Sequence, residues 1–240
     1  MGLLKLAFKR ETAMPMLALT FASAVSVMLV CARVVWTGHL RYAFLVWNLF
    51  LAWLPLIFAL LAHEKYREGA GRNWRFFMLA GAWLLFFPNA PYIFTDLIHL
   101  TTRFLPHFWV DLVLILLCAL TGLVSGFVSL FLMQAIVFRR FGWVTSWMFV
   151  AAAAGLSSFG IYLGRFLRFN SWDVLFQPAR VYHGIGQSLA EPMPNMAPRS
   201  FMVLFATFLF LAYVMLYGLT HLRRDMLSPV PVEPPNMKEA

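Results

Sequence analysis

The stretch LLFFPNAPYIFTDLIHL, residues 84–100, begins like a membrane-spanning helix and ends with titratable side chains. Pro88, Asn89 and Pro91 interrupt its apolar run, and Asp96 and His99 follow the interruption. Each proline removes a backbone donor and disfavours helix at the residue before it. We therefore predict a helix that is broken at Pro88 and Pro91, with polar groups placed just beyond the break.

The composition of the whole chain indicates an integral membrane protein. Of its 240 residues, 62% are hydrophobic and 12% are charged, well below the charged share of an ordinary soluble domain. A helix needs about 20 apolar residues to cross the hydrocarbon core. Runs of about that length lie at residues 14–36, 42–62, 74–95, 108–137, 142–167 and 199–220. We predict an all-α, polytopic transmembrane helix bundle of about six helices, the third of them broken.

The runs form a single predicted transmembrane domain, residues 14–222, between two polar tails. The N-terminal tail covers residues 1–13, and the proline-rich tail 223–240 is predicted to be disordered. The first run is either an anchor or a signal peptide, because basic residues precede an apolar stretch with a small-residue triplet at 22–24. We favour an anchor, since the apolar run continues to Ala32 and is too long for a signal core.

The distribution of Lys and Arg predicts the orientation of the bundle. When six spans alternate sides, most of the 19 basic residues fall on the side of the two termini. These are Lys5, Lys9, Arg10, Lys65, Arg67, Arg72, Arg75, Arg139, Arg140, Arg223, Arg224 and Lys238. The positive-inside rule then places both termini in the cytoplasm and the end that carries Asp96 outside.

The net charge of +9 is distributed over short loops, with no continuous basic helix or nucleic-acid reader motif. We therefore expect the lipid bilayer and anionic lipid headgroups as partners, and no nucleic acid. Cys31 and Cys118 fall in different spans without a partner at metal-ligand spacing, so neither a disulfide framework nor a metal site is predicted. The sequence indicates no particular cofactor or oligomeric state.

The break should gather polar side chains at the outer end of the third span. Asn89 is suited to capping the break, and Thr95 is suited to capping a short second helix. In that helix Asp96 and His99 share one face, because they are three residues apart. Tyr92 lies between the break and this second helix.

Two further segments place charged groups at the same level. Asp111 stands at the head of the fourth span, where a carboxylate is costly unless it is paired or wet. The stretch GRFLRFNSWDVL carries Arg165, Arg168, Asn170 and Asp173 out of the end of the fifth span. Because Arg165 follows a long uncharged run, we expect it either to snorkel to the interface or to pair with a carboxylate.

Three segments resemble those of one known family. They are FFPNAPYIFTDLIHL, the Trp-x-Asp of Trp109 and Asp111 with the glycine-rich run after it, and GRFLRFNSWDVL. They are similar to the signature segments of a bacterial integral-membrane family, domain of unknown function 1361, and the likeness covers about residues 40–220. The resemblance implies a polytopic protein of the bacterial inner membrane. It brings no reaction, ligand or catalytic residue with it.

The first functional hypothesis is a polar site at the outer face. Its candidate acid/base residues are Asp96, His99, Asp111 and Asp173, and its candidate substrate-binding residues are Asn89, Tyr92, Arg165, Arg168, Asn170 and Trp172. Arg holds phosphate oxygens in its planar fork, and a His or carboxylate activates water or a hydroxyl. Such a site would bind or process an anionic lipid-like or polyprenyl-linked substrate. No hydrolase motif such as HExxH or GxSxG accompanies it, so whether the protein is an enzyme stays open.

Two alternatives use the same residues differently. In a structural or partner-binding scaffold, the carboxylates form internal ion pairs with Arg165 and Arg168. In a small-solute transporter, the broken helix presents a half-helix end, and Asn48, Asn89 and Ser125 form a neutral path. The near absence of charge at mid-span argues against a coupled pump.

Two GxxxG pairs occur in the fourth and fifth spans, at Gly122 with Gly126 and at Gly160 with Gly164. Missing side chains let helices approach closely. We interpret both pairs as packing surfaces within the bundle, with a dimer seam as the alternative.

Overall fold

The computed structural model describes residues 13–67, 74–100, 107–171, 173–190 and 197–226, and all of their regular structure is helical. The elements are α2 (Ala13–Thr37), α3 (Phe44–Arg67), α4 (Trp74–Phe86), α5 (Asn89–Tyr92), the 3₁₀ helix η1 (Ile93–His99), α6 (Phe108–Arg165), α7 (Asp173–Phe176), α8 (Pro178–Ala190) and α9 (Ala197–Met226). The predicted all-α class is confirmed. Most of the two predicted tails, 1–13 and 223–240, lies outside the described residues.

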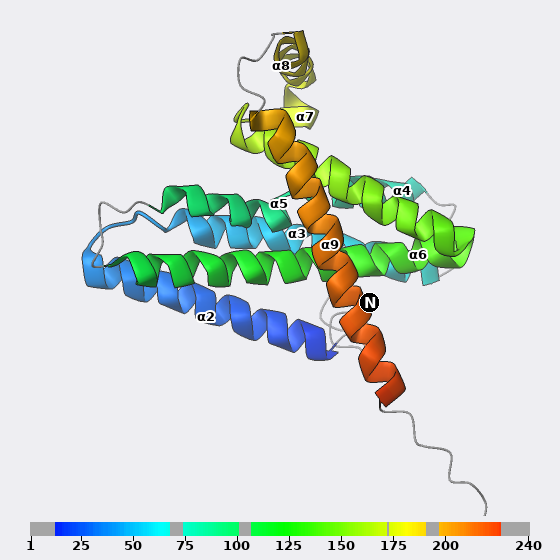
Figure 1. The fold of residues 1–240 in the computed structure, drawn as a ribbon, viewed down its shortest axis with the longest axis horizontal. Coiled ribbons are helices and arrows are strands. Elements are labelled where there is room, and N and C mark those ends of the chain that lie inside the picture. The colour runs from blue at the N-terminus through cyan, green and yellow to red at the C-terminus, as the bar shows by residue number, and fades with distance from the viewer. Residues whose placement is uncertain (1–12, 68–73, 101–106, 172, 191–196, 227–240) are drawn as a thin grey trace, which may run out of the picture.

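Five helical segments are long and apolar enough to cross a membrane: Ala13–Thr37, Phe44–Arg67, Trp74–His99, Phe108–Arg165 and Ser200–Thr220. The 58-residue α6 provides two spans, because the backbone leaves the helical conformation at Gly142, where φ is 85°. Figure 1 shows α6 turning back on itself at one end of the bundle. The prediction of about six spans is therefore confirmed, although the turn occurs at Gly142 and residues 138–141 are helical.

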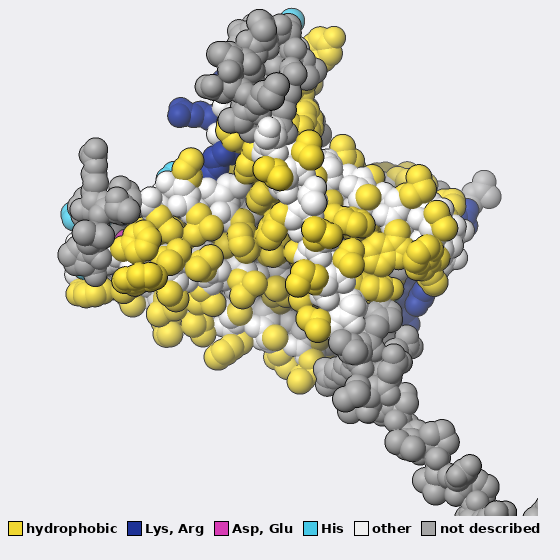
Figure 2. All heavy atoms as spheres, in the orientation of Figure 1, with side chains coloured by type: hydrophobic (Ala, Val, Ile, Leu, Met, Phe, Trp, Pro, Cys, Tyr) yellow, Lys and Arg dark blue, Asp and Glu magenta, His cyan; other side chains and the backbone are white. Residues whose placement is uncertain are grey.

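The helices form one elongated bundle in which α3 packs mainly against α6 and α4. Figure 1 shows α9 crossing the other long helices at a steep angle, and it packs mainly against α6. Figure 2 shows a face dominated by hydrophobic side chains, with Lys and Arg confined to its edges. Such a surface is costly in water and favourable in lipid, so the bundle is a multi-pass membrane domain.

The third span is interrupted as predicted. Its first part, α4, ends at Phe86, and after a turn at Phe87 and Pro88 the chain continues as α5 and then η1. Pro88 has no N–H for the carbonyl of Leu84, and Pro91 has none for that of Phe87. The Phe87 carbonyl instead accepts a hydrogen bond from the Ala90 N–H, at 3.2 Å.

The glycines of the first half of α6 make room for this broken helix. A Cβ atom added to Gly122 would lie 2.8 Å from the Ala90 carbonyl oxygen, and one added to Gly126 would lie 2.8 Å from Ala90 Cβ. Both distances are shorter than real carbon contacts, so α5 reaches α6 only because these side chains are missing.

The glycines of the second half of α6 also make room for the broken helix, on its other side. A Cβ at Gly160 would lie 2.6 Å from Pro88 Cγ, and one at Gly164 would lie 3.3 Å from the Tyr92 ring. Both GxxxG pairs therefore pack within the bundle, as we interpreted them. The two halves of α6 enclose the interrupted segment between them.

Candidate functional site

The Asn89 side chain hydrogen-bonds to the backbone at the break in the third span. In a continuous helix the Ala90 N–H would bond to the Phe86 carbonyl, but here it bonds to Phe87. The Asn89 side-chain amide donates to the Phe86 carbonyl at 3.0 Å and to Ser171 Oγ at 3.0 Å. Asn89 thus caps the break, as predicted, and also ties it to the segment that follows α6.

Arg165 is the centre of a polar cluster just beyond the break. Its Nη2 contacts Asp96 Oδ1 at 2.5 Å, and both its Nε and its Nη2 donate to Thr95 Oγ1, at 3.0 and 2.6 Å. The guanidinium carbon lies 4.5 Å from the centre of the Tyr92 ring, a cation–π contact. Of the two outcomes considered for Arg165, the structure shows pairing with a carboxylate.

Asp96 is almost completely buried, with 1% of its surface exposed. Its second oxygen, Oδ2, accepts a hydrogen bond from Asn48 Nδ2 at 2.8 Å, so both carboxylate oxygens are occupied. His99 lies nearby, with its Nε2 3.3 Å from Arg165 Nη1 and 3.9 Å from Asp96 Oδ1. The His99 side chain is 47% exposed and packs edge-on against Phe44. His99 is therefore the member of this cluster that solvent reaches.

We predicted that Thr95 caps the short second helix, and this prediction was wrong. The residue that precedes η1 is Tyr92, which makes no side-chain cap, and Thr95 Oγ1 donates instead to the Tyr92 carbonyl at 2.6 Å. The hydroxyl oxygen thereby faces the guanidinium of Arg165 as an acceptor.

Asp111 belongs to a separate pair and does not join the Arg165 cluster. Arg33 on α2 holds it in a two-pronged contact, from Nε to Oδ1 at 2.7 Å and from Nη2 to Oδ2 at 3.2 Å. The Tyr42 side chain also hydrogen-bonds to Asp111. Burial and, secondarily, the Asp111 charge raise the pKa of the Tyr42 phenol, so Tyr42 remains a donor. The expected convergence of Asp111 on Arg165 or Arg168 was wrong.

The segment after α6 holds the remaining candidates. The Asp173 carboxylate accepts a hydrogen bond from the Asn170 backbone N–H at 2.6 Å, which closes a local turn at the start of α7. Arg168 is exposed and has a left-handed backbone, with φ of 59°, and it makes no hydrogen bond or ion pair with a described residue. Trp172 lies outside the described residues. Asp173 and Arg168 therefore belong to this loop and not to the Asp96 cluster.

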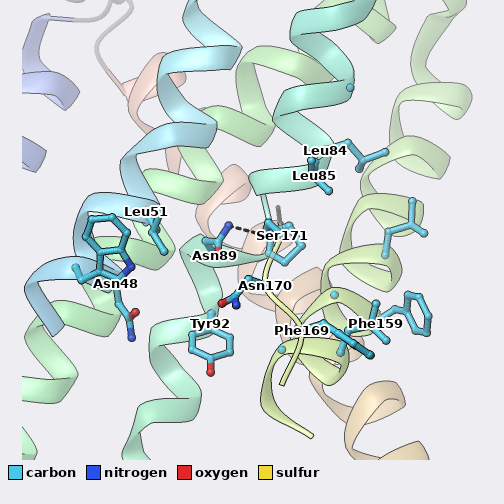
Figure 3. A pocket seen from close by; sticks show the side chains of 17 residues that line it. Asn48, Leu51, Leu84, Leu85, Asn89, Tyr92, Phe159, Phe169, Asn170 and Ser171 are labelled. Carbon is cyan, nitrogen blue, oxygen red and sulfur yellow. Dashed lines mark hydrogen bonds between the residues drawn. The ribbon is translucent and has the colours of Figure 1, made fainter. Parts of the chain in front are cut away.

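A cavity of about 460 Å³ lies beside the broken helix, between α3, α4 and the second half of α6 (Figure 3). We call it the break cavity. It is lined by Trp47, Asn48, Leu51, Gly81, Leu84, Leu85, Pro88, Asn89, Tyr92, Leu156, Phe159, Gly160, Leu163, Gly164, Phe169, Asn170 and Ser171. Neither Asp96 nor Arg165 lines the cavity. Two lining residues contact this pair: Asn48 donates to Asp96, and the Tyr92 ring lies under Arg165.

The lining of the break cavity changes from apolar to polar along the helices. Gly81, Leu84 and Leu156 lie well inside their spans, and their exposure shows that the cavity opens on the apolar surface of the bundle. Asn170 and Ser171 lie just past the end of α6, where the lining is amide and hydroxyl. The cavity is therefore an amphipathic groove with its polar end at the end of a span.

Sequence reasoning missed several of these residues. It placed Asn48 on a neutral path with Asn89 and Ser125, but Ser125 is buried, donates to the Ala52 carbonyl at 3.2 Å and does not line the cavity. It did not identify Ser171, although this residue lies in the quoted GRFLRFNSWDVL stretch. Within the described part of the chain, no three His, Cys, Asp or Glu side chains are grouped as metal ligands would be.

The apolar spans and the amphipathic cavity that opens on their surface define a multi-pass helical membrane protein. Residues 47–216 match the family described as "Protein of unknown function (DUF1361)", and the chain belongs to that family. Searches of curated proteins and of solved structures each found no match. The family membership predicted from the three sequence segments is thereby confirmed.

Proposed function

We propose that the protein binds an anionic lipid-like molecule, such as a polyprenyl-linked phosphate, in the break cavity. The observation that carries the proposal is the change in its lining from Leu84 and Leu156 inside the spans to Asn170 and Ser171 at their end. A lipid has the same gradient, with an apolar tail and a polar headgroup. The tail would lie along the leucines and the headgroup beside the amide and hydroxyl groups.

The charges around the polar end support an anionic headgroup. No described carboxylate lines the break cavity, and the nearby Asp173 carboxylate is already engaged by the Asn170 backbone N–H at 2.6 Å. Arg168, next in sequence to the lining residue Phe169, is exposed and makes no ion pair with a described residue. The Arg180 guanidinium lies 5.8 Å from the centre of the Phe169 ring. A phosphate near Asn170 would therefore meet arginines, whose planar donors suit phosphate oxygens.

The contacts of the carboxylates favour binding over chemistry. Asp96 accepts from Arg165 and Asn48, and Asp111 accepts from Arg33. A general base needs a lone pair directed at the substrate, and these groups direct theirs at protein donors.

We place the protein in the bacterial inner membrane with both termini in the cytoplasm. The excess of Lys and Arg on the side of the termini supports this orientation. The polar end of the break cavity then faces outward, so the headgroup would be held at the outer leaflet.

A second candidate function is a membrane scaffold that holds a partner protein. The Arg33–Asp111 and Arg165–Asp96 pairs favour it, because each joins segments far apart in the sequence and needs no ligand. Buried pairs of this kind fix how elements are arranged more than they add stability.

The test uses two variants of the second half of α6. Leu156 lines the break cavity, and Met148 is on the same helix, is more exposed and does not line it. Leu156→Trp should fill the cavity, whereas Met148→Trp adds the same ring elsewhere. Binding of a polyprenyl phosphate, and of the uncharged polyprenol of the same length, would be measured by native mass spectrometry in detergent micelles.

We expect the wild type and Met148→Trp to retain the phosphate-bearing lipid, and Leu156→Trp to lose it. The polyprenol should bind more weakly than the phosphate. Equal binding by the two variants would refute the proposal. A stoichiometric protein partner that copurifies with both variants, without any bound lipid, would favour the scaffold.

A further inference from the structure

A second cavity lies between α6 and α9, away from the break cavity. It has a volume of about 470 Å³ and is lined by Phe131, Gln134, Ala135, Phe138, Arg139, Tyr217 and Thr220. Tyr217 packs on the Phe131 ring, with ring centres 6.1 Å apart, and this contact joins the two helices on one side of the cavity. We call it the α6–α9 cavity.

Gln134 gives this cavity an unused donor. Its side chain is 96% buried, and its Oε1 accepts a hydrogen bond from Tyr213 Oη. The amide nitrogen of Gln134 has no partner among the described residues, although the side chain lines the cavity. Because Gln134 lines the cavity, its amide N–H is available to an acceptor on a bound molecule, and such a hydrogen bond would stabilise the complex.

Arg139 gives the cavity a positive charge at its mouth. It is exposed and makes no hydrogen bond or ion pair with a described residue. It follows Gln134 by five positions, which corresponds to about 7.5 Å along a helix. The cavity therefore offers an uncharged donor inside and a cation about one and a half turns further out.

We propose that the α6–α9 cavity binds one anionic glycerophospholipid. Its phosphate would contact Arg139, an ester carbonyl would accept from the Gln134 amide, and its acyl chain would follow Phe131 and Ala135. In such a lipid the phosphate lies further out than the ester groups. Arg139 likewise lies further out along the helix than Gln134. Basic pockets between membrane helices recognise anionic headgroups in this way. This site lies between the first half of α6 and α9, whereas the break cavity uses the second half of α6 with α3 and α4, and the two ligands differ.

Arg140 provides the matched control. It is the next residue in the chain and is also exposed, but it does not line the cavity. Arg139→Gln, Arg140→Gln and Arg139→Lys would be compared for retention of phosphatidylglycerol, with phosphatidylcholine of the same acyl chains as the neutral lipid. The bound lipid would be counted by native mass spectrometry, and Tm in lipid-free detergent would check the folding of each variant.

We expect Arg139→Gln to weaken phosphatidylglycerol binding about tenfold, as the loss of one charge-assisted contact implies, and Arg140→Gln to leave it nearly unchanged. Arg139→Lys should restore part of the affinity. Leu156→Trp should not affect this site, which separates the test from that of the break cavity. Equal losses for the two arginines would indicate a diffuse surface charge and overturn the proposal. So would equal binding of phosphatidylcholine, or displacement by glycerol phosphate.

Discussion

Removing either partner of the Arg33–Asp111 pair should destabilise the protein strongly, and removing both should not. The two side chains are 11% and 5% exposed, so solvent screens their interaction little. Replacing Asp111 by Leu leaves the Arg33 guanidinium without its two hydrogen bonds, and an uncompensated charge of this kind costs about 3–5 kcal/mol. Arg33→Met should cost a similar amount because the Asp111 carboxylate is then unpaired. In the double variant both charges are gone, and most of the loss should be recovered.

The assay is a double-mutant cycle on the free energy of unfolding in detergent. The coupling energy should be at least about 4 kcal/mol and favourable, because each single variant loses about 3–5 kcal/mol and the double variant recovers most of that loss. Single variants with unchanged stability would refute the structural role of Asp111. If Asp111→Leu instead kept its stability and lost lipid binding, Asp111 would return as a residue of the ligand site.

Three further predictions concern the backbone and a phenol. Gly126→Ala should cost about 1–3 kcal/mol of unfolding free energy because its Cβ would lie 2.8 Å from that of Ala90, whereas Gly155→Ala, with nothing within 4 Å, should be neutral or stabilising. Arg168→Gly should stabilise by about 1 kcal/mol, since φ is 59° there, yet weaken polyprenyl phosphate binding; a rise in Tm with unchanged binding would remove Arg168 from the site. The pKa of the Tyr42 phenol is raised in the folded state, so the phenol ionises first in the unfolded chain. The free energy of unfolding should therefore fall as pH rises above the ordinary pKa of 10.0. In Tyr42→Phe the Tm, measured by thermal unfolding, should fall less steeply over the same pH range.

Most of the fold followed from the sequence because a membrane restricts the choices. Uncharged runs of spanning length must be helices, and two prolines three residues apart must interrupt one. The boundary between the fourth and fifth spans was less predictable. Arg139 and Arg140 indicated a loop, but Arg is a good helix former, so the helix continues to Gly142, where the glycine permits a positive φ.

The pairing of charges could not be predicted from the sequence. Asp96, Asp111 and Arg165 all lie at the same predicted level of the bundle, but that level does not say which helices are neighbours. The packing of α2 against α6 brings Arg33 to Asp111, across 78 positions of the chain. The capping role of Asn89 was predictable, because it depends only on the adjacent helix break.

The break and the cavity beside it depend on the same contacts. Gly160 and Gly164 admit Pro88 and Tyr92 against α6, and the same two glycines line the break cavity. Asn89 completes the interrupted helix and donates to Ser171 at the polar end of the cavity. A headgroup bound beside Ser171 would therefore contact the hydrogen-bond network that holds the break in place. Because packing fixes that network before any ligand arrives, its polar groups need little rearrangement on binding, and less of the binding free energy is lost to ordering them.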